Sequence, residues 1–271
     1  MTIRSKTTRI VKTLETLTSH TELARKCVEQ APSYGRGLST VKSWPTPGGR
    51  PGAEATRNPL ATYFDEHRGE RTLHKWVHYF DIYDRHFRKF VGKPVNVVEV
   101  GVSGGGSLDM WRHYFGDGCR MYGIDIVESC KRFENEHTSI FIGDQEDREF
   151  WRRFRNEVPK IDVFIDDGGH TAEQQIVTAE EMLPHMNPGS VYLCEDVHGR
   201  DHGFLAYAGA LSDSLHCITP EYSPNGEIRG ERSLFQKGVA SVHTYPFVVV
   251  LELHDFPPRS FVAPKHGGGS S

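Results

Sequence analysis

From residue 95 onward, short apolar runs alternate with segments whose apolar residues recur at helical spacing. Strands are predicted for the apolar runs VNVVEV, RMYGID, SIFIGD, DVFIDD and GSVYLCED, and helices for LDMWRHYF, REFWRRFRNEV and EQQIVTAEEMLPHM. Strands that recur at intervals of about 20–25 residues, with helices between them, describe βαβ units and a parallel sheet. Near the C-terminus, GVASVHTY and VVVLELHDF flank a Tyr-Pro turn and predict an antiparallel hairpin at the sheet edge. The pattern therefore predicts a doubly wound α/β fold with a mostly parallel, seven-stranded sheet.

The N-terminal part of the chain has a different pattern. Residues 1–30 are predicted to form a helix or a pair of short helices, and the Pro-, Gly- and Ser-rich stretch at 31–59 a linker or an extended arm. We therefore expect an N-terminal helical segment with its arm at 1–57, one α/β domain at 58–258 and a disordered tail at 259–271.

Residues 61–93 are predicted to be helical and are rich in aromatic side chains. A stripe of them recurs at helical spacing: Trp76, Tyr79, Phe80, Tyr83 and Phe87. Such a stripe is typical of a helix that packs against a neighbouring domain, and we expect that role here.

Composition excludes several classes of protein. A chain of 271 residues with 37% hydrophobic and 25% charged residues is ordinary for a soluble globular protein, and a net charge of −4 indicates no nucleic-acid-binding surface. No apolar run reaches the roughly 20 residues that span a bilayer, so no membrane partner is expected. The five cysteines form no C-x-x-C pair, so neither a zinc knuckle nor a disulfide framework is indicated. A reducing, cytoplasmic setting is therefore expected. The Ser-, Thr- and Arg-rich start fits either a transit peptide or an ordinary amphipathic helix.

The first predicted strand leads into a glycine turn, EVGVSGGGSLDMW. Glycines in such a turn let the backbone approach a ligand, and the following helix offers free N–H groups. Glu99 precedes the turn, where a carboxylate repels a pyrophosphate but accepts hydrogen bonds or attracts a cation. Asp125 ends the second strand, where it can grip ribose hydroxyls, and Gly143–Gln145 end the third, where a side chain can meet an adenine edge. An adenosine-bearing cofactor without a pyrophosphate, such as S-adenosylmethionine, fits these acids better than a nicotinamide dinucleotide does.

Acidic residues end the fourth and fifth predicted strands. The fourth ends in Asp166 and Asp167, and the fifth in Glu195 and Asp196. Ligands of an open α/β sheet bind at the carboxyl ends of its strands, so neighbouring fourth and fifth strands would bring Asp167, Glu195 and Asp196 together. Like charges this close repel one another, and a divalent cation removes the conflict. An all-oxygen ligand set predicts Mg²⁺ or Mn²⁺ rather than zinc.

His170 follows the fourth strand and is expected near this metal site without being required as a ligand. An imidazole within reach of a hydroxyl held by the metal is a natural general base, so His170 is the predicted catalytic residue. The side chain of Asp166 should point away from that of Asp167, and we expect it near the cofactor. A turn histidine and a helix-capping Glu-Asp pair are the plainer interpretations of these residues.

These motifs resemble those of a known family. The segments VVEVGVSGGGSLDMWRHYF, YGIDI, IGDQ, IDDGGH and YLCEDVH are similar to parts of class I S-adenosylmethionine-dependent methyltransferases, which have a Rossmann-like fold. The nearest group is the metal-dependent sugar O-methyltransferases of macrolide biosynthesis, of the mycinamicin and tylosin type. A cephamycin-pathway methyltransferase-like protein shares much of the pattern. The likeness covers about residues 58–255.

The resemblance implies a set of site residues. The implied metal ligands, Asp167, Glu195 and Asp196, and the implied base, His170, coincide with the residues chosen above. Cofactor contacts are implied for Glu99, Gly101, Ser103, Asp125, Asp144, Gln145 and Asp166, and Gly105 and Ser107 of the same glycine turn complete the predicted set. The resemblance also implies a homo-oligomer, in which the arm at 31–59 reaches a neighbouring subunit's site.

We therefore expect a metal-dependent O-methyltransferase that moves a methyl group from S-adenosylmethionine to a small-molecule acceptor, a hydroxyl of a sugar or polyhydroxylated natural product. The alternative is an S-adenosylmethionine-binding protein of the same fold that acts in a hydroxylase/methyltransferase complex or as a non-catalytic partner. A short-chain nicotinamide oxidoreductase requires a Tyr-x-x-x-Lys pair, and none of the ten tyrosines has lysine four residues on.

Overall fold

The structure is a computed structural model that describes residues 3–45, 58–199, 201–217, 221–222, 228–230, 232–256 and 261–265. Internal contacts divide the chain into two units, residues 1–55 and residues 56–271. Among the described residues, no helix combines the length and the apolarity that crossing a bilayer requires. All five cysteines lie in the described ranges and carry free thiols.

A seven-stranded mixed sheet forms the centre of the second unit, with the strand order β3-β2-β1-β4-β5-β9-β8. Its parallel strands are β1 (Val95–Val100), β2 (Cys119–Asp125), β3 (Thr138–Ile142), β4 (Ile161–Asp166) and β5 (Met186–Cys194). β9 (Val248–Leu253) pairs antiparallel with β5, and β8 (Val239–Tyr245) pairs antiparallel with β9 at the edge. The predicted doubly wound α/β fold with an antiparallel edge hairpin is therefore confirmed.

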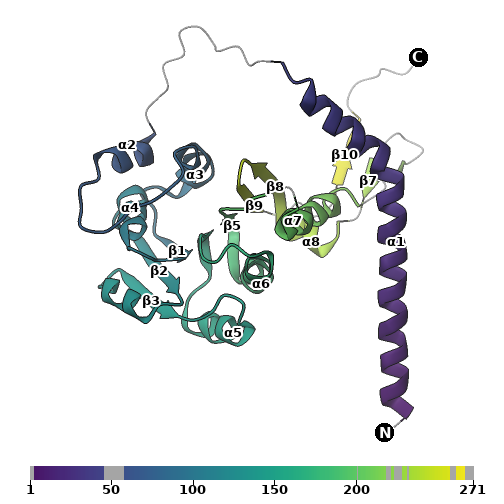
Figure 1. Ribbon diagram of the computed structural model, residues 1–271, viewed down its shortest axis with the longest axis horizontal. Helices are drawn as coiled ribbons and strands as arrows, with labels where there is room; N and C mark the ends of the chain where they lie inside the picture. The colour runs from purple at the N-terminus through teal and green to yellow at the C-terminus, as the bar shows by residue number, and fades with distance from the viewer. Residues whose placement is uncertain are drawn as a thin grey trace. The chain divides into compact units, whose positions relative to one another are not determined.

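Helices cover both faces of the sheet (Figure 1). One face carries α2 (Pro59–Glu66), α3 (Tyr79–Phe87) and α4 (Gly106–Phe115), and the other carries α5 (Arg148–Glu157), α6 (Ala172–Met182) and α7 (Gly203–Ser214). Shorter elements are η1 (Arg88–Phe90), η2 (Glu128–Phe133), η3 (Leu183–His185) and α8 (Leu234–Gly238). Because side chains alternate along a strand, Val97 packs into the core beneath α3 and α4 while Val98 packs into the core beneath α5 and α6.

The first unit contains one long helix, α1 (Ile3–Lys42). The prediction of a linker that starts at residue 31 is wrong, since residues 31–42 continue this helix. The hydroxyl groups of Ser39 and Thr40 donate to the backbone carbonyls four residues back, each at 3.0 Å, so these residues satisfy their hydrogen bonds inside the helix. The part of the predicted arm at 46–57 lies outside the described residues.

The predicted helix at 61–93 is interrupted by a loop at 67–78. Burial of the stripe is confirmed for four aromatic residues that are at most 1% exposed, namely Tyr79, Phe80, Tyr83 and Phe87. They pack into the core of their own unit, so the predicted contact with a neighbouring domain is wrong. Burial does not extend to Trp76, which lies in the loop and is 49% exposed. The loop forms because its backbone bonds to the start of α4 rather than to itself: Gly106 N–H donates to the Thr72 carbonyl at 3.1 Å.

A small antiparallel sheet contains β6 (Glu221–Tyr222), β7 (Ile228–Gly230) and β10 (Phe261–Ala263), in the order β10-β7-β6. The predicted disordered tail at 259–271 is therefore wrong for β10, whose backbone pairs with β7. Residues 259–260 and 266–271 lie outside the described residues.

The two acids after Ile165 differ in their surroundings. Asp166 is fully buried among side chains beneath α5 and α6, where Gln145 Nε2 donates to its Oδ1 at 3.1 Å and the Tyr192 hydroxyl donates to its Oδ2 at 3.2 Å. The expectation that Asp166 contacts the cofactor is thereby corrected, because strand alternation turns its side chain into the core. Burial raises the pKa of Asp166 to about 7, although the hydrogen bonds from Gln145 and Tyr192 oppose the shift.

Replacing Asp166 with asparagine should change how stability depends on pH. Between about pH 4 and pH 7, the folded chain holds a proton on Asp166 that the unfolded chain has lost, so the free energy of unfolding falls as pH rises through this window. Each unit of pKa difference is worth about 1.4 kcal/mol. Asp166→Asn has no such proton to lose. In urea unfolding, the free energy of unfolding of wild type should therefore fall by several kcal/mol more than that of the variant between about pH 4 and pH 7.

Asp162→Asn, which removes another carboxylate of β4, is the matched control. A difference between wild type and Asp166→Asn that stays constant with pH would contradict a buried, proton-binding Asp166.

Candidate functional site

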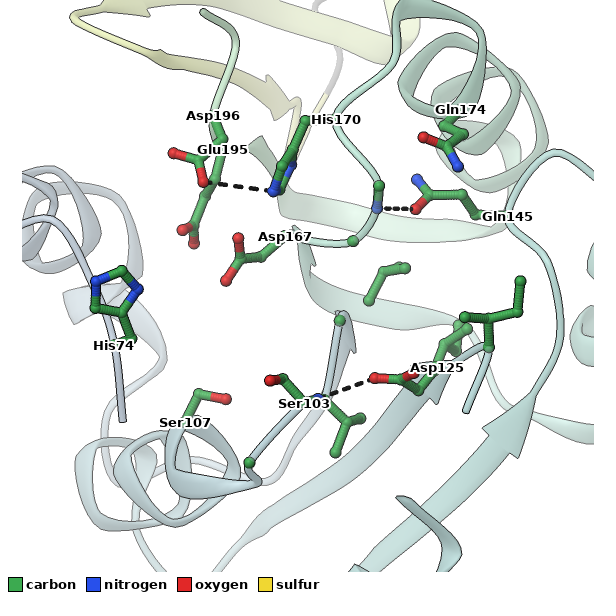
Figure 2. A pocket seen from close by; sticks show the side chains of 18 of the residues that line it. His74, Ser103, Ser107, Asp125, Gln145, Asp167, His170, Gln174, Glu195 and Asp196 are labelled. Carbon is green, nitrogen blue, oxygen red and sulfur yellow. Dashed lines mark hydrogen bonds and ion pairs between the residues drawn. The ribbon is translucent and has the colours of Figure 1, made fainter. Parts of the chain in front are cut away.

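A cavity of about 500 Å³ opens at the carboxyl ends of the parallel strands (Figure 2). Its wall consists of strand ends, their turns and one stretch of the loop before α3, namely 72–76, 100–104, 124–126, 143–145, 167–170 and 195–196, together with Ser107 of α4 and Gln174 of α6. Ligands of open α/β sheets bind in this position. The cavity is therefore the candidate site.

Two close approaches explain glycines in the turn after β1. A Cβ on Gly101, whose φ is 92°, would lie 1.9 Å from the backbone oxygen of Asp167, so glycine is needed where the turns after β1 and β4 touch. A Cβ on Gly106 would lie 2.5 Å from the carbonyl oxygen of Thr72. These glycines are needed for close contacts between segments of the protein itself, whether or not a ligand also approaches them. The second contact holds the loop at 67–78 against the cavity.

Most of the predicted cofactor residues line the cavity: Gly101, Ser103, Ser107, Asp125, Asp144 and Gln145. Asp125 accepts hydrogen bonds from two backbone N–H groups, that of Ser103 among them, both at 2.9 Å. These bonds fix the carboxylate and leave oxygen lone pairs for ribose hydroxyls. Gln145 differs, because its side-chain amide binds Asp166 and the Gly169 N–H. It positions the turn after β4 instead of offering its amide to an adenine edge.

The remaining predicted cofactor residues, Glu99, Gly105 and Asp166, do not line the cavity. Glu99 is fully buried behind the wall, where Ser107 Oγ donates to it at 2.7 Å and the Trp111 indole N–H donates at 2.9 Å. Gly105 caps α4 with a φ of 75°. The sequence does not show whether the side chain of an acid at a strand end faces a ligand or the core. Only the structure shows that Glu99 and Asp166 face the core.

Lys75 lies at the centre of the acidic cluster, although no sequence motif marks it. Its Nζ is 2.6 Å from Asp167 Oδ2, 3.1 Å from Glu195 Oε2 and 3.6 Å from Glu99 Oε1, and its side chain is 2% exposed. Burial alone would lower the pKa of Lys75, but the charges of the three carboxylates raise it, so the ammonium stays protonated. Asp167 and Glu195 are 92 and 120 residues further along the chain, so local sequence carries no signal of these contacts.

One ammonium does not neutralise three carboxylates, two of which, Glu99 and Glu195, are buried. Burial, and then the charge of Asp167, raises the pKa of Glu195 to about 8, against the opposing effects of Lys75 and Tyr83. Burial also raises the pKa of Glu99. The cluster is therefore stabilised either by an added proton or by an added cation beside Asp167.

Asp196 is held beside His170 by residues of α3 and its preceding loop. The Tyr79 hydroxyl donates to Asp196 Oδ1 at 2.6 Å, and the Trp76 indole N–H donates to the same oxygen at 3.0 Å. His170 Nε2 lies 3.6 Å from Asp196 Oδ2 (Figure 2). His198 Nε2 lies 3.3 Å from Asp196 Oδ1. The carboxylate is thus oriented from one side and faces an imidazole on the other.

The acids and His170 fit a divalent cation. Asp167, His170 and Asp196 each place a candidate ligand atom within 4.8 Å of the other two. Glu195, the third predicted ligand, is not in this group; it bonds to Lys75, which also bonds to Asp167. Carboxylate oxygens suit Mg²⁺ or Mn²⁺, and the negative charge around them is only partly compensated. Asp167 and Asp196 are the residues best placed to hold such an ion.

An aromatic rim, made of Trp76, His198 and Phe247, adjoins Asp196. The ring centroid of Trp76 lies 5.7 Å from that of Phe247 and 6.1 Å from that of His198, and the last two rings are 4.6 Å apart. Phe247, in the turn between β8 and β9, has a φ of 65°, which is unusual for a bulky residue. In the described part of the chain, the non-glycine residues with positive φ are Ser103, Asp196 and Phe247. Ser103 and Asp196 line the cavity, and Phe247 packs against Trp76, which also lines it; backbone strain of this kind clusters at functional sites.

No protein-family model matches the chain. The 8-demethyl-8-alpha-L-rhamnosyl tetracenomycin-C 2'-O-methyltransferase of Streptomyces olivaceus is 34% identical over 148 residues, which cover 51% of this chain and 38% of that protein. The demethylmacrocin O-methyltransferase of Streptomyces fradiae is 36% identical over 133 residues, or 45% of this chain and 33% of that protein. The mycinamicin VI 2''-O-methyltransferase of Micromonospora griseorubida is 37% identical over 130 residues, with 45% and 32% covered. The chain spans less than half the length of these relatives.

Solved structures of MycE methyltransferase from the mycinamycin biosynthetic pathway are also similar. One is a complex with Mg and SAH and has a TM-score of 0.58 and 27% identity, covering 73% of this chain and 53% of that one. Another contains mycinamycin VI as well and gives the same values. Over its α/β domain, the chain therefore has the class I methyltransferase fold and resembles the macrolide sugar O-methyltransferases.

Proposed function

We propose that the α/β domain transfers the methyl group of S-adenosylmethionine to a hydroxyl group of a sugar on a natural product, with a divalent cation beside the acceptor. The observation that carries this proposal is that one cavity has two chemically different halves. The glycine turn and Asp125 form one half, and Asp167, His170 and Asp196 form the other. The names of the relatives, which are sugar O-methyltransferases, and the Mg and SAH in the MycE complex support it.

The half beside Asp125 suits the methyl donor. The carboxylate of Asp125 is held by the Ser103 N–H and can accept hydrogen bonds from a ribose. The sulfonium and α-amino groups of S-adenosylmethionine are both positively charged, so the nearby acids attract them. A pyrophosphate is negatively charged, so the same acids would repel it.

The half beside His170 suits the acceptor. The imidazole of His170 is 42% exposed, lines the cavity and faces Asp196, which orients it. When bound at Asp167 and Asp196, a divalent cation would lower the pKa of a neighbouring hydroxyl. His170 takes the hydroxyl proton as the acceptor oxygen bonds to the methyl carbon and the carbon–sulfur bond breaks, which leaves S-adenosylhomocysteine.

The aromatic rim supports a sugar as the acceptor. A pyranose ring presents C–H groups on its face and hydroxyl groups at its edge, so an aromatic ring can pack against the face while acids bind the edge. Trp76 and Phe247 are 49% and 39% exposed beside Asp196. The left-handed backbone of Phe247 costs about 1–3 kcal/mol, and the contacts of its ring with Trp76, His78 and His198 offset part of that cost. A role in binding explains why the ring is kept there.

Calorimetry with S-adenosylmethionine and Mg²⁺ tests the two halves separately. Wild type should bind S-adenosylmethionine with or without Mg²⁺. Asp167→Asn should keep that affinity and weaken Mg²⁺ binding by more than about tenfold, because it removes a charged ligand. Glu173→Gln, which removes an exposed acid of α6, is the control. Equal Mg²⁺ binding by Asp167→Asn and the control would remove the ion from the proposal.

An assay for S-adenosylhomocysteine, run with a panel of glycosides that carry vicinal hydroxyl groups, tests the reaction. His170→Asn should lower kcat by about 10²- to 10⁴-fold, the usual contribution of a general base, and keep the affinity for S-adenosylmethionine. His137→Gln removes a histidine outside the cavity and should keep kcat. An unchanged kcat in His170→Asn excludes its role as base. Binding of S-adenosylmethionine without turnover of any glycoside would favour the non-catalytic alternative.

Phe247→Gly should separate acceptor binding from stability. Glycine adopts a φ of 65° readily, so the free energy of unfolding should change by less than about 1 kcal/mol. The KM for the acceptor should rise, because the ring is lost. Phe256→Ala removes a phenylalanine that is 90% exposed and should leave KM unchanged. A KM that is the same in Phe247→Gly and wild type would exclude the rim as an acceptor surface.

A further inference from the structure

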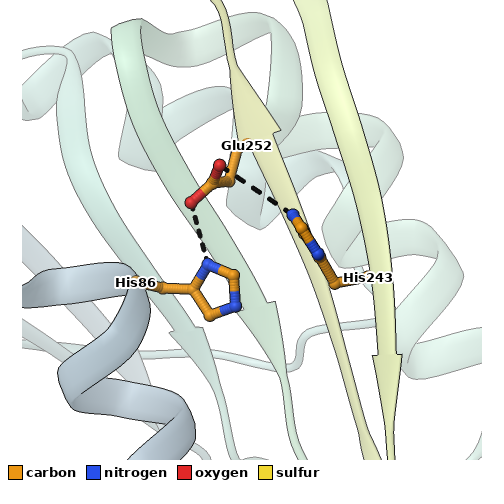
Figure 3. Close-up of side chains that lie close together, drawn as sticks. All are labelled: His86, His243 and Glu252. Atoms are coloured by element: carbon orange, nitrogen blue, oxygen red, sulfur yellow. Dashed lines mark hydrogen bonds and ion pairs between the residues drawn. The ribbon is translucent and has the colours of Figure 1, made fainter.

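A second cluster of metal-ligating side chains lies outside the cavity, between α3 and the edge hairpin (Figure 3). His86 from α3, His243 from β8 and Glu252 from β9 each place one ligand atom within 4.8 Å of the other two. The carboxylate of Glu252 lies between the imidazoles: Oε1 is 2.8 Å from His86 Nδ1, and Oε2 is 3.9 Å from His243 Nε2. These three residues take no part in the site described above.

The register of the hairpin brings the cluster together. Glu252 lies opposite Ser241 and His243 lies opposite Val250, so His243 and Glu252 are diagonal neighbours on one face of the sheet. α3 packs on that face and adds His86. Because β8 is the edge strand, the side chains of His243 and Glu252 remain 37% and 29% exposed, whereas that of His86 is 3% exposed. An ion from solvent can therefore reach the cluster.

Neighbouring groups prepare these side chains for a metal. His86 Nδ1 lies 2.8 Å from Glu252 Oε1 and the Tyr245 hydroxyl lies 2.9 Å from His86 Nε2, so Tyr245 can accept the ring N–H once an ion replaces the proton between Nδ1 and Glu252. A neutral imidazole beside an ionised carboxylate is the state that metal binding requires. The Ser241 hydroxyl, 2.9 Å from His243 Nε2, is the contact that an ion would displace.

We propose that His86, His243 and Glu252 bind one Zn²⁺ ion, with water in the fourth position. Two imidazole nitrogens and one carboxylate oxygen are a ligand set that zinc uses, and nitrogen ligands select against Mg²⁺, which prefers oxygen. Zinc–ligand bonds of about 2.0–2.2 Å require these atoms to move closer together. The partly exposed side chain of His243 has the freedom to do so.

The charges around the cluster set the strength of the site. Arg85 acts electrostatically on His243, and Lys89 acts on Glu252, both from the α3 side. A bound Zn²⁺ adds to this positive charge, and Glu252 is the one anionic ligand of the three. A moderate affinity follows, because these cations repel the ion that Glu252 attracts.

The ion would connect the edge hairpin to the helix that orients the catalytic acids. His86 lies three residues after Tyr83, whose hydroxyl donates to Glu195 at 2.7 Å. α3 also carries Tyr79, the hydrogen-bond partner of Asp196. Zinc at the far end of α3 fixes that helix to β8 and β9 and contributes stability rather than chemistry.

Titration calorimetry of full-length protein with ZnCl₂ tests the site. An Asp167→Asn background in excess Mg²⁺ suppresses zinc binding at the cavity. In that background, His243→Gln and Glu252→Gln should each weaken zinc binding by more than about 100-fold, because each removes one of the three ligands. Both side chains are partly exposed, so neither substitution should disturb the core. Tyr245→Phe, which removes an outer hydrogen bond only, should weaken it by about 10- to 100-fold. His137→Gln, which removes an exposed histidine beside Glu136, should have no effect.

Zinc should also raise Tm in the His137→Gln control and not in His243→Gln. X-ray absorption of the zinc-loaded background protein gives a result that does not depend on the folding of any variant at the cluster, and two imidazole nitrogens are expected in the zinc shell. Unchanged zinc affinity in both ligand variants, or a shell with fewer than two imidazoles, overturns the proposal. Neither ligand variant touches the cavity, so the outcome is independent of methyl transfer.

Discussion

A buried ammonium between the ends of two strands is the contact on which the rest of the site depends. The ends of β4 and β5 bring Asp167 beside Glu195, which is 1% exposed, and burying a charge without a partner costs several kcal/mol. Lys75 supplies the partner. It can do so because the loop at 67–78 is bonded to the start of α4 at Gly106, where any larger residue would push the loop away.

The same loop and the helix that follows it, α3, bind two acids in different positions, one buried and one at the mouth of the cavity. Lys75 and Tyr83 hold Glu195 on the inside, and Trp76 and Tyr79 hold Asp196 at the mouth of the cavity. The inner acid is thereby committed to protein contacts, while the outer one keeps an oxygen directed at His170. A lysine and a divalent cation can thus serve one acidic cluster without competing for every oxygen.

The sequence predicts the strands well and the site only in part. Strands buried on both faces are continuous apolar runs, so β1 is predicted at the residues where it occurs, Val95–Val100, and the acids that follow β4 and β5 are identified with it. The direction of a side chain at a strand end is not encoded in this way, and Glu99 was expected at the cofactor although it faces the core. No local sequence pattern marks Lys75 as a site residue, because its partners are distant in the sequence. Composition also misleads in α1, whose last turns are rich in Gly and Ser.

Phe247 stands in a hairpin turn at the antiparallel edge, apart from the parallel strands that end in the acids. A substitution at that turn alters the surface offered to an acceptor and leaves the packing of β1 against β4 untouched. At Gly101, by contrast, even one methyl group would collide with the backbone after β4. On the proposed function, the residues of the hairpin turn can therefore vary without disturbing the contact between the turns after β1 and β4, and a library for altered acceptor selectivity belongs at that turn.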